Sequence, residues 1–158
     1  MRILLATDAD WLVDEVTGAL GGDDVSFTVC REGRVVAAQV AARVPDIGIF
    51  DLQIGSMGGI AVTMSLRLDE SSGVLPHVPV LMLLDRRADV HLARRSGAEG
   101  WLVKPLDSLR LKRAVTALLD GRPYTEGVPP RPSPDAAEPD TADSETAEPA
   151  EEEPAPAG

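Results

Sequence analysis

The sequence contains few aromatic residues, one cysteine, two histidines and two lysines in 158 positions. Because Phe, Trp and Tyr make up only 3% of the chain, a hydrophobic core must be built from aliphatic side chains. The single cysteine, Cys30, excludes an internal disulfide, and its apolar surroundings favour a buried, inert thiol in a reducing compartment. Metal sites built on cysteine and histidine are excluded as well, because His77 and His91 lie far apart in the sequence.

Long apolar runs and strong positive charge are also missing. No stretch approaches the roughly 20 residues that a membrane-spanning helix needs, and the N-terminal sequence lacks the layout of a signal peptide. We therefore expect a cytoplasmic protein with no membrane partner. Nucleic acid is not an expected partner either, because residues 1–120 hold 13 basic and 16 acidic residues, a net charge of −3, and show no aromatic-plus-basic pattern.

Composition divides the chain near residue 120. Residues 121–158 contain nine of the 13 prolines, ten of the 26 acidic residues and two of the 15 basic ones, so this segment carries a net charge of −8. It has almost no large apolar side chains with which to offset the entropic cost of ordering. We therefore predict a folded domain over residues 1–120 and a disordered acidic tail, rich in Pro, Ala and Glu, over residues 121–158.

Within residues 1–120, short apolar runs alternate with segments of helical periodicity. The apolar runs have no polar break, as in strands that are buried on both faces of a parallel sheet. This alternation predicts an α/β domain with a doubly wound, five-stranded parallel sheet and helices on both faces. The expected strands span residues 3–6, 25–30, 47–50, 80–84 and 101–103. The expected helices span residues 11–20, 34–43, 60–68 and 86–95, and a fifth helix capped by Asp107 runs through Leu119.

Charged side chains follow three of the expected strands: Asp8 the first, Asp51 the third and Lys104 the fifth. The ligand crevice of a doubly wound sheet lies at the carboxyl ends of its strands, so we expect these residues to converge. Two carboxylates, a backbone carbonyl and water form a hard-oxygen site that suits Mg²⁺. A lysine at the rim can bind a phosphoryl group as a point charge, which makes a nearby aspartate a reasonable acceptor for phosphoryl transfer.

Two motifs carry a resemblance to a known family. Residues 45–52, PDIGIFDL, are followed by Met57-Gly58-Gly59, and residues 97–105 read GAEGWLVKP. These stretches resemble the phospho-acceptor strand and the fifth-strand signature of the receiver domain of two-component response regulators, a family that includes stand-alone chemotaxis regulators. The resemblance covers residues 2–119. It implies a flavodoxin-like (βα)5 fold with strand order 2-1-3-4-5, usually with a cis peptide before Pro105.

The resemblance also implies roles for single residues. Asp51 is the expected phospho-acceptor and Lys104 the expected phosphoryl contact. Asp8, Asp51 and the main-chain carbonyl of Gln53 are the expected ligands of Mg²⁺, and Trp101 stands at the position of an aromatic switch residue. The family implies a sensor histidine kinase as partner and a non-enzymatic role in phosphorelay signal transduction.

Four positions depart from the family's pattern. Thr7 stands where a second carboxylate is usual, Leu84 replaces a Thr or Ser, Asp85 replaces a small residue and Gly55 replaces a common proline. We therefore expect a weakened Mg²⁺ site and no hydroxyl after strand four to bind the phosphoryl group. Trp101 is then expected to be half-buried packing in one orientation rather than a moving switch.

We interpret the chain as a single-domain response regulator, a monomer or weak dimer, that acts through contacts with an unknown protein target. The expected partner face is made by the fourth helix, the fifth strand and the fifth helix, and its basic residues on the fourth helix are Arg86, Arg87, Arg94 and Arg95. One alternative is a pseudo-receiver adaptor that binds its partner independently of phosphorylation. Another is an enzyme or flavin-binding protein on the same scaffold, which is disfavoured because no phosphate-binding loop follows the first strand. For Asp8 the alternative role is a helix N-cap.

Overall fold

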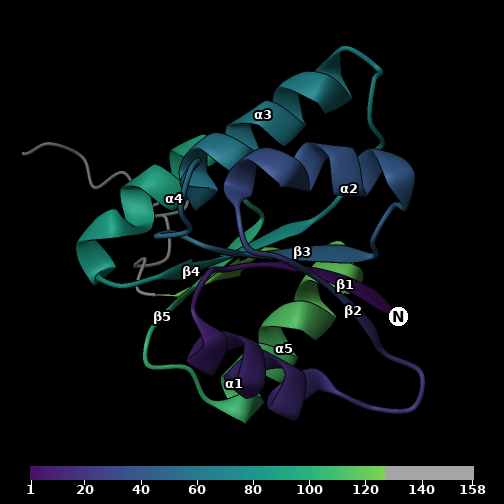
Figure 1. Cartoon of the computed structure of the whole chain (residues 1–158). Coiled ribbons are helices and arrows are strands. Elements are labelled where there is room, and N and C mark those ends of the chain that lie inside the picture. The colour runs from purple at the N-terminus through teal and green to yellow at the C-terminus, as the bar shows by residue number, and fades with distance from the viewer. Residues whose placement is uncertain (127–158) are drawn as a thin grey trace, which may run out of the picture. The chain divides into compact units, whose positions relative to one another are not determined.

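The computed structural model describes residues 1–126, and residues 127–158 of the predicted tail lie outside the described residues. Six parallel strands form one sheet in the order β2-β1-β3-β4-β5-β6, with helices on both faces (Figure 1). The strands are β1 (Arg2–Ala6), β2 (Ser26–Cys30), β3 (Ile47–Asp51), β4 (Val80–Leu84), β5 (Gly100–Val103) and β6 (Tyr124–Thr125). The α-helices are α1 (Asp10–Leu20), α2 (Val36–Ala42), α3 (Gly59–Ser71), α4 (Val90–Ser96) and α5 (Ser108–Leu119). The predicted doubly wound fold and the order of its first five strands are confirmed.

Two hydrophobic layers sandwich the sheet. Helices α1 and α5 cover one face, whereas α2, α3 and α4 cover the other (Figure 1). Successive residues of a strand point to opposite faces: Ile3 and Leu5 of β1 pack with α1 and α5, and Leu4 and Ala6 pack with α2 and α3. Apart from Asp51 at the end of β3, the central strands β1, β3 and β4 are buried and apolar from Ile3 of β1 onward, because helices cover both faces of the sheet.

The strand register brings the carboxyl ends of β1, β3, β4 and β5 to one edge of the sheet. Ala6 pairs with Phe50, Asp51 with Leu83, and Leu84 with Val103. Residues that directly follow these positions in the sequence therefore lie next to one another. This alignment places the sequence-predicted site at the carboxyl edge.

Several helix boundaries differ from the predicted ones. Two of the predicted helices begin with 3₁₀ turns, Gly33–Val35 (η1) and Arg87–Asp89 (η2), so that α2 and α4 are shorter than expected. Helix α1 begins after Ala9, with no side chain capping its N-terminus, so the alternative N-cap role of Asp8 is wrong. By contrast, the Asp107 carboxylate accepts the Arg110 N–H at 2.8 Å at the start of α5.

The fold continues past the boundary expected after residue 120. Gly121, with φ of 72°, turns the chain after α5, and Tyr124–Thr125 then pair in parallel with Gly100 and Trp101 as β6. Composition gave no indication of this strand, because its two residues are followed directly by the proline- and acid-rich sequence. The five strands predicted from the sequence are therefore six.

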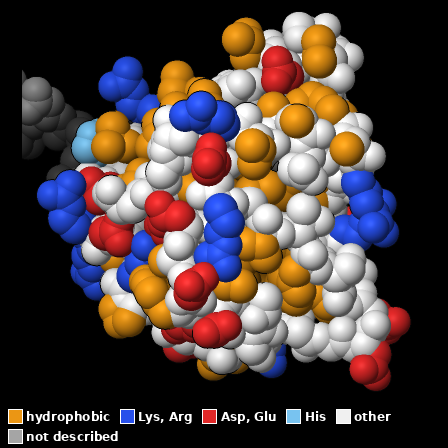
Figure 2. Space-filling model, in the orientation of Figure 1, with side chains coloured by type: hydrophobic (Ala, Val, Ile, Leu, Met, Phe, Trp, Pro, Cys, Tyr) orange, Lys and Arg blue, Asp and Glu red, His pale blue; other side chains and the backbone are white. Residues whose placement is uncertain are grey.

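Cys30 is buried, and burial raises the pKa of its thiol, which fits the expected inert role. On the face shown in Figure 2, acidic and basic side chains are interspersed. Among residues 1–126, no helix is both long and apolar enough to cross a membrane.

Candidate functional site

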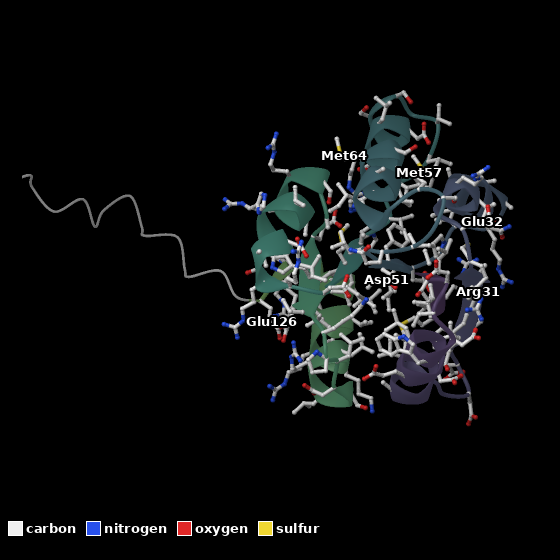
Figure 3. The ribbon with its side chains drawn as sticks, turned by 60° about the vertical axis from the view of Figure 1, so that its left-hand side comes forward. Arg31, Glu32, Asp51, Met57, Met64 and Glu126 are labelled. Atoms are coloured by element: carbon white, nitrogen blue, oxygen red, sulfur yellow. The ribbon has the colours of Figure 1, made fainter. Side chains whose placement is uncertain are left out.

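Asp51, the last residue of β3, lies at the centre of the carboxyl edge (Figure 3). Its side chain is only 4% exposed, and both carboxylate oxygens have partners. Oδ1 accepts from Lys104 Nζ at 2.8 Å and from the Gln53 N–H at 3.2 Å. Oδ2 accepts from the Thr7 hydroxyl at 2.9 Å. A buried carboxylate is thus stabilised by one cation and two neutral donors.

Lys104 follows β5 and is shared by two carboxylates. Its ammonium group contacts Asp51 Oδ1 at 2.8 Å and Asp85 Oδ1 at 3.0 Å, and it lies 5.7 Å from the centre of the Trp11 ring. Burial by itself lowers the pKa of Lys104, but the hydrogen bonds and charges of Asp51 and Asp85 outweigh burial and raise that pKa. The lysine therefore stays charged at neutral pH. Its cis peptide bond to Pro105 agrees with the resemblance.

Asp8 lies at the exposed rim of the same edge. Its Oδ2 accepts the Gly55 N–H at 3.1 Å, which ties the loop between β3 and α3 to the end of β1. A Cβ added to Gly55 would lie 3.1 Å from that carboxylate oxygen. The departure at position 55 thus leaves room for Asp8 beside the loop.

The residues at this edge offer a small set of hard oxygen ligands. Asp8 and Asp51 supply two carboxylates near the Gln53 backbone, and Mg²⁺ in proteins commonly takes one or two carboxylates and keeps several waters. In the described part of the chain, no cluster of three or more His, Cys, Asp and Glu side chains could hold a metal ion. A Mg²⁺ site at this edge would draw on two carboxylates and the Gln53 carbonyl, with a hydroxyl at Thr7 in place of a third carboxylate.

Leu84 and Trp101 pack in one cluster on the α4 side of the sheet. Trp101 is 3% exposed, more deeply buried than the half-buried position expected for it. Its indole Nε1 donates to the Glu126 carbonyl at 2.9 Å. Leu84 is wholly buried and brings no donor to the edge.

Sequence reasoning missed the role of Glu126, which lies beside α5 (Figure 3). Its side chain accepts from Arg110 Nε at 2.6 Å and from Arg110 Nη2, and it also accepts the Val103 N–H at 3.3 Å. The hydrogen bond to Arg110 lowers the pKa of Glu126. No local motif marks this glutamate, because its partners are 16 and 23 residues away.

The four arginines of the expected partner face do not share one helix. Arg86 precedes η2 and is bound to the buried Asp89 at 3.0 Å, and Arg87 lies in η2. Arg94 and Arg95 are exposed in the last turn of α4. The Arg86 guanidinium is thus paired with Asp89 in its own turn. Fewer of the four arginines are therefore available to a partner than the sequence suggested.

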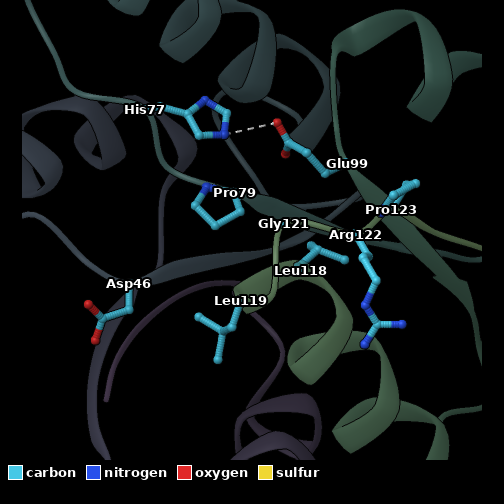
Figure 4. Close-up of a pocket in the computed structure, with 9 residues that line it drawn as sticks. All are labelled: Asp46, His77, Pro79, Glu99, Leu118, Leu119, Gly121, Arg122 and Pro123. Carbon is cyan, nitrogen blue, oxygen red and sulfur yellow. Dashed lines mark ion pairs between the residues drawn. The ribbon is translucent and has the colours of Figure 1, made fainter.

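A hollow lies at the opposite edge of the sheet, near the amino ends of β3, β4 and β5. It has a volume of about 410 Å³ and contains none of the predicted site residues. Figure 4 shows His77 and Glu99 facing each other at its wall, with Nε2 and Oε1 3.4 Å apart. Glu99 also accepts from Arg67 and from the Val80 N–H, so these polar groups hold elements together.

Comparison with known proteins assigns the fold to a family. Residues 3–116 match the family model of the response regulator receiver domain. The transcriptional regulatory protein CseB of Streptomyces avermitilis is 29% identical over 138 residues, covering 86% of this chain and 56% of CseB. The DNA-binding response regulator MtrA of Mycobacterium leprae is 32% identical over 120 residues, covering 75% of this chain and 51% of MtrA. The chain therefore spans about half the length of these curated relatives.

Solved structures agree with this assignment. The receiver domain of the putative response regulator NarL from Mycobacterium tuberculosis superposes with a TM-score of 0.65 at 26% identity, covering 77% of this chain and 97% of that domain. The chemotaxis response regulator CheY4 of Vibrio cholerae shares the fold, with a TM-score of 0.65 at 22% identity. The superposition covers 74% of this chain and 97% of the CheY4 chain. Sequence and fold together show that this chain belongs to the response regulator receiver domain family.

Proposed function

We propose that Asp51 accepts a phosphoryl group from a sensor histidine kinase and that Lys104 neutralises the charge of that group. The observation that carries this proposal is the contact of 2.8 Å between Lys104 Nζ and the Asp51 carboxylate at the end of β3. An aspartate beside a fixed cation at the mouth of a parallel sheet has the position and the charge balance that phosphoryl transfer requires.

In the proposed transfer, a carboxylate oxygen of Asp51 forms a new bond to phosphorus. The bond from phosphorus to the donor nitrogen of the kinase histidine breaks, and its electron pair stays with the imidazole. Oδ2 is the better candidate nucleophile, because it accepts one hydrogen bond whereas Oδ1 accepts two. Lys104 is already held at Oδ1, so its charge lies beside the developing negative charge of the phosphoryl oxygens without further rearrangement.

Asp8, Asp51 and the main-chain carbonyl of Gln53 are the residues that would hold Mg²⁺. The ion, when bound, neutralises negative charge on the phosphoryl oxygens. Thr7 supplies a hydroxyl where a carboxylate would add charge, so we propose weaker Mg²⁺ binding than in a receiver with three acids at this site. The Asp85 carboxylate also binds Lys104, at 3.0 Å. Its negative charge partly offsets the positive charge that the lysine offers to the phosphoryl group.

The test is incubation of the full chain with acetyl phosphate and Mg²⁺, followed by intact mass measurement. We expect the mass to rise by one phosphoryl group in the natural chain and in the Asp85→Asn variant, but not in Asp51→Asn. Asp85→Asn is the matched control because it alters a second carboxylate on the same lysine. A phosphoryl group that persists in Asp51→Asn would contradict the acceptor assignment.

A second candidate, the pseudo-receiver adaptor, is supported by a separate observation. Leu84 lacks a hydroxyl, and Trp101 is buried and bonded to the Glu126 carbonyl. Phosphorylation therefore has no donor at strand four through which to favour another conformation. Beryllofluoride with Mg²⁺ tests this candidate: the adaptor requires amide resonance shifts confined to the surroundings of Asp51, whereas a responsive receiver shifts α4 and β5 as well.

We propose further that the chain acts through protein contacts and is not an enzyme. The same proposal places it in the cytoplasm as a monomer or weak dimer. The relatives CseB and MtrA are described as transcriptional and DNA-binding regulators, and the chain matches only about half of each. We propose that this chain acts without DNA contact, because its folded part carries a slight negative charge. Binding of the full chain to random duplex DNA at low salt would contradict this part of the proposal.

A further inference from the structure

Within residues 1–126, the outer side of β2 has no partner strand. β2 pairs with β1 alone, in five consecutive parallel pairs without a bulge, whereas β6 covers the opposite edge of the sheet. A strand edge presents backbone N–H and C=O groups that readily pair with another strand. Native sheets usually protect such an edge with charged residues, proline or a bulge. β2 reads SFTVC and has none of these devices.

The hydrogen bonds between β2 and β1 show which backbone groups point outward. Ser26, at the start of β2, donates its N–H to the carbonyl of the first residue of the chain at 2.9 Å, and Cys30, at its end, accepts the Thr7 N–H at 3.0 Å. Successive residues of a strand direct their N–H and C=O groups to opposite sides. The even-numbered residues of β2 therefore face β1, and the N–H and C=O groups of Phe27 and Val29 point away from the sheet.

No residue of β2 is charged, although the whole chain carries a net charge of −11. Copies of an acidic protein repel one another, so two copies approach most closely through a surface that lacks acidic side chains. The outer side of β2 is such a surface. It fits a second copy of this chain, whereas a charged peptide would find no opposite charge along the strand.

The charges at the two ends of β2 favour an antiparallel contact. Asp23 and Asp24 lie just before the strand, and Arg31 and Arg34 follow it with Glu32 between them; all of these residues are exposed. Figure 3 shows Arg31 and Glu32 at the outer margin of the molecule. The two arginines pair with exposed carboxylates, and such ion pairs contribute little to stability. In an antiparallel pair the acidic end of each copy lies beside the arginines of the other.

We propose that β2 is a self-association site, at which two copies of the chain pair antiparallel about a two-fold axis through Thr28. In this register Phe27 of one copy exchanges both of its hydrogen bonds with Val29 of the other, and Val29 does the same with Phe27. Thr28 lies opposite Thr28 of the other copy. An aromatic residue beside a β-branched one, and threonine beside threonine, are favourable cross-strand pairs.

The side chains of β2 already lie on the faces that this pairing needs. Phe27 packs against the cluster on the α1–α5 side of the sheet, and Cys30 belongs to the cluster on the α2–α3 side. Alternation therefore places Val29 on the same face as Phe27, and Thr28 on the same face as Cys30. Val29 is 37% exposed, and Thr28 is exposed as well. Both faces thus offer side chains to a second copy.

Self-association through β2 leaves the proposed phosphorylation site accessible. The carboxyl edges of the two sheets lie at opposite ends of an antiparallel pair, and β3, which carries Asp51, lies two strands away from β2. A strand of five residues offers a line of contact only about 17 Å long, so the association is weak and depends on protein concentration. The inference goes beyond the proposed phosphoryl transfer and does not depend on it.

Sedimentation equilibrium of the full chain measures the association over a wide range of concentration. Physiological ionic strength screens the repulsion between copies beyond about 8 Å, and we expect a reversible equilibrium of monomer and dimer. Thr28→Lys and Thr28→Glu each place like charges opposite each other at the axis, so each variant should associate at least about tenfold more weakly. An equimolar mixture of the two variants places opposite charges there and should restore dimerisation.

Val29→Lys and Val35→Lys form a matched pair, because the two valines are 37% and 38% exposed and gain the same charge. Val29→Lys removes both aromatic–valine pairs of the dimer and should weaken association about tenfold. Val35 lies in η1, outside the strand, so Val35→Lys should leave association unchanged. Asp51→Asn should also leave it unchanged, and Thr28→Lys should still gain a phosphoryl group in the mass assay, so the two proposals fail separately.

Thermal unfolding followed by circular dichroism checks that each variant is folded, and the series at Thr28 and Val29 are independent of each other. A natural chain that stays monomeric at every concentration would overturn the proposal. A mixture of Thr28→Lys and Thr28→Glu that fails to associate would overturn it too, because the two-fold register would then be wrong. An equal loss of association in Val35→Lys and Val29→Lys would show that the contact lies elsewhere.

Discussion

The Thr7 hydroxyl offers a direct test of how the edge carboxylate is stabilised. Thr7→Val keeps the shape of the side chain but removes the donor to Asp51 Oδ2, which lies 2.9 Å away. The same hydroxyl accepts the Ala9 N–H at 3.1 Å, so the change breaks two hydrogen bonds. Thr7 is wholly buried and the Asp51 side chain is 4% exposed, so water cannot readily replace the lost donor.

The expected cost follows from the charge of the acceptor. A buried hydrogen bond to an ionised group contributes about 1.5–3 kcal/mol, whereas one between neutral groups contributes about 1 kcal/mol. Asp51 retains Lys104 and the Gln53 N–H after the change, so we expect Thr7→Val to lower the free energy of unfolding by about 2 kcal/mol.

Urea unfolding at neutral pH measures this difference. Thr63→Val is the matched control, because Thr63 is equally buried but its hydroxyl donates only to the neutral Gly59 carbonyl at 2.8 Å; its expected cost is about 1 kcal/mol. In an Asp51→Asn background, the cost of Thr7→Val should fall to a similar value, since the acceptor is then neutral. Equal costs for Thr7→Val and Thr63→Val in the natural chain would refute the reasoning.

Four further predictions concern Mg²⁺ binding and the side chains of Trp101, Glu126 and Arg67. Thr7→Asp should tighten Mg²⁺ binding in a calorimetric titration, and equal affinities would show that the ligand assignment is wrong. With Trp11→Phe leaving Trp101 as the only indole, beryllofluoride at full occupancy should leave the emission unchanged; a large change would restore a moving switch. The pKa of Glu126 is lowered in the folded chain, so its stabilising contribution is complete above about pH 4.3 and is lost as the pH falls through the lowered value. Glu126→Gln should therefore lose stability at neutral pH and show a shallower acid dependence of unfolding. Arg67→Met should lower the free energy of unfolding by about 2 kcal/mol, because it removes the donor to the partly buried Val78 carbonyl and Glu99 carboxylate; a change within error would contradict this bridging role.

Much of the fold and the location of the site could be predicted from local sequence. Uninterrupted apolar runs indicate strands covered on both faces, and the alternation with helices dictates a parallel sheet whose carboxyl ends meet. Asp51 and Lys104 follow two such strands directly, so their proximity could be predicted without coordinates. The absence of a hydroxyl at Leu84 and of a carboxylate at Thr7 is likewise visible in the sequence.

Only the tertiary structure decided how these groups are bonded. Thr7 donates to Asp51 and Asp85 shares Lys104, and these contacts join residues 44 and 19 positions apart, whose geometry depends on strand register. The same holds for Glu126, which composition placed in the tail although Arg110, Val103 and Trp101 bind it. Local sequence determines periodicity and the order of the elements, because these depend on neighbouring residues. Hydrogen-bond partners across the sheet depend on how separate segments pack, and this is set by the fold as a whole.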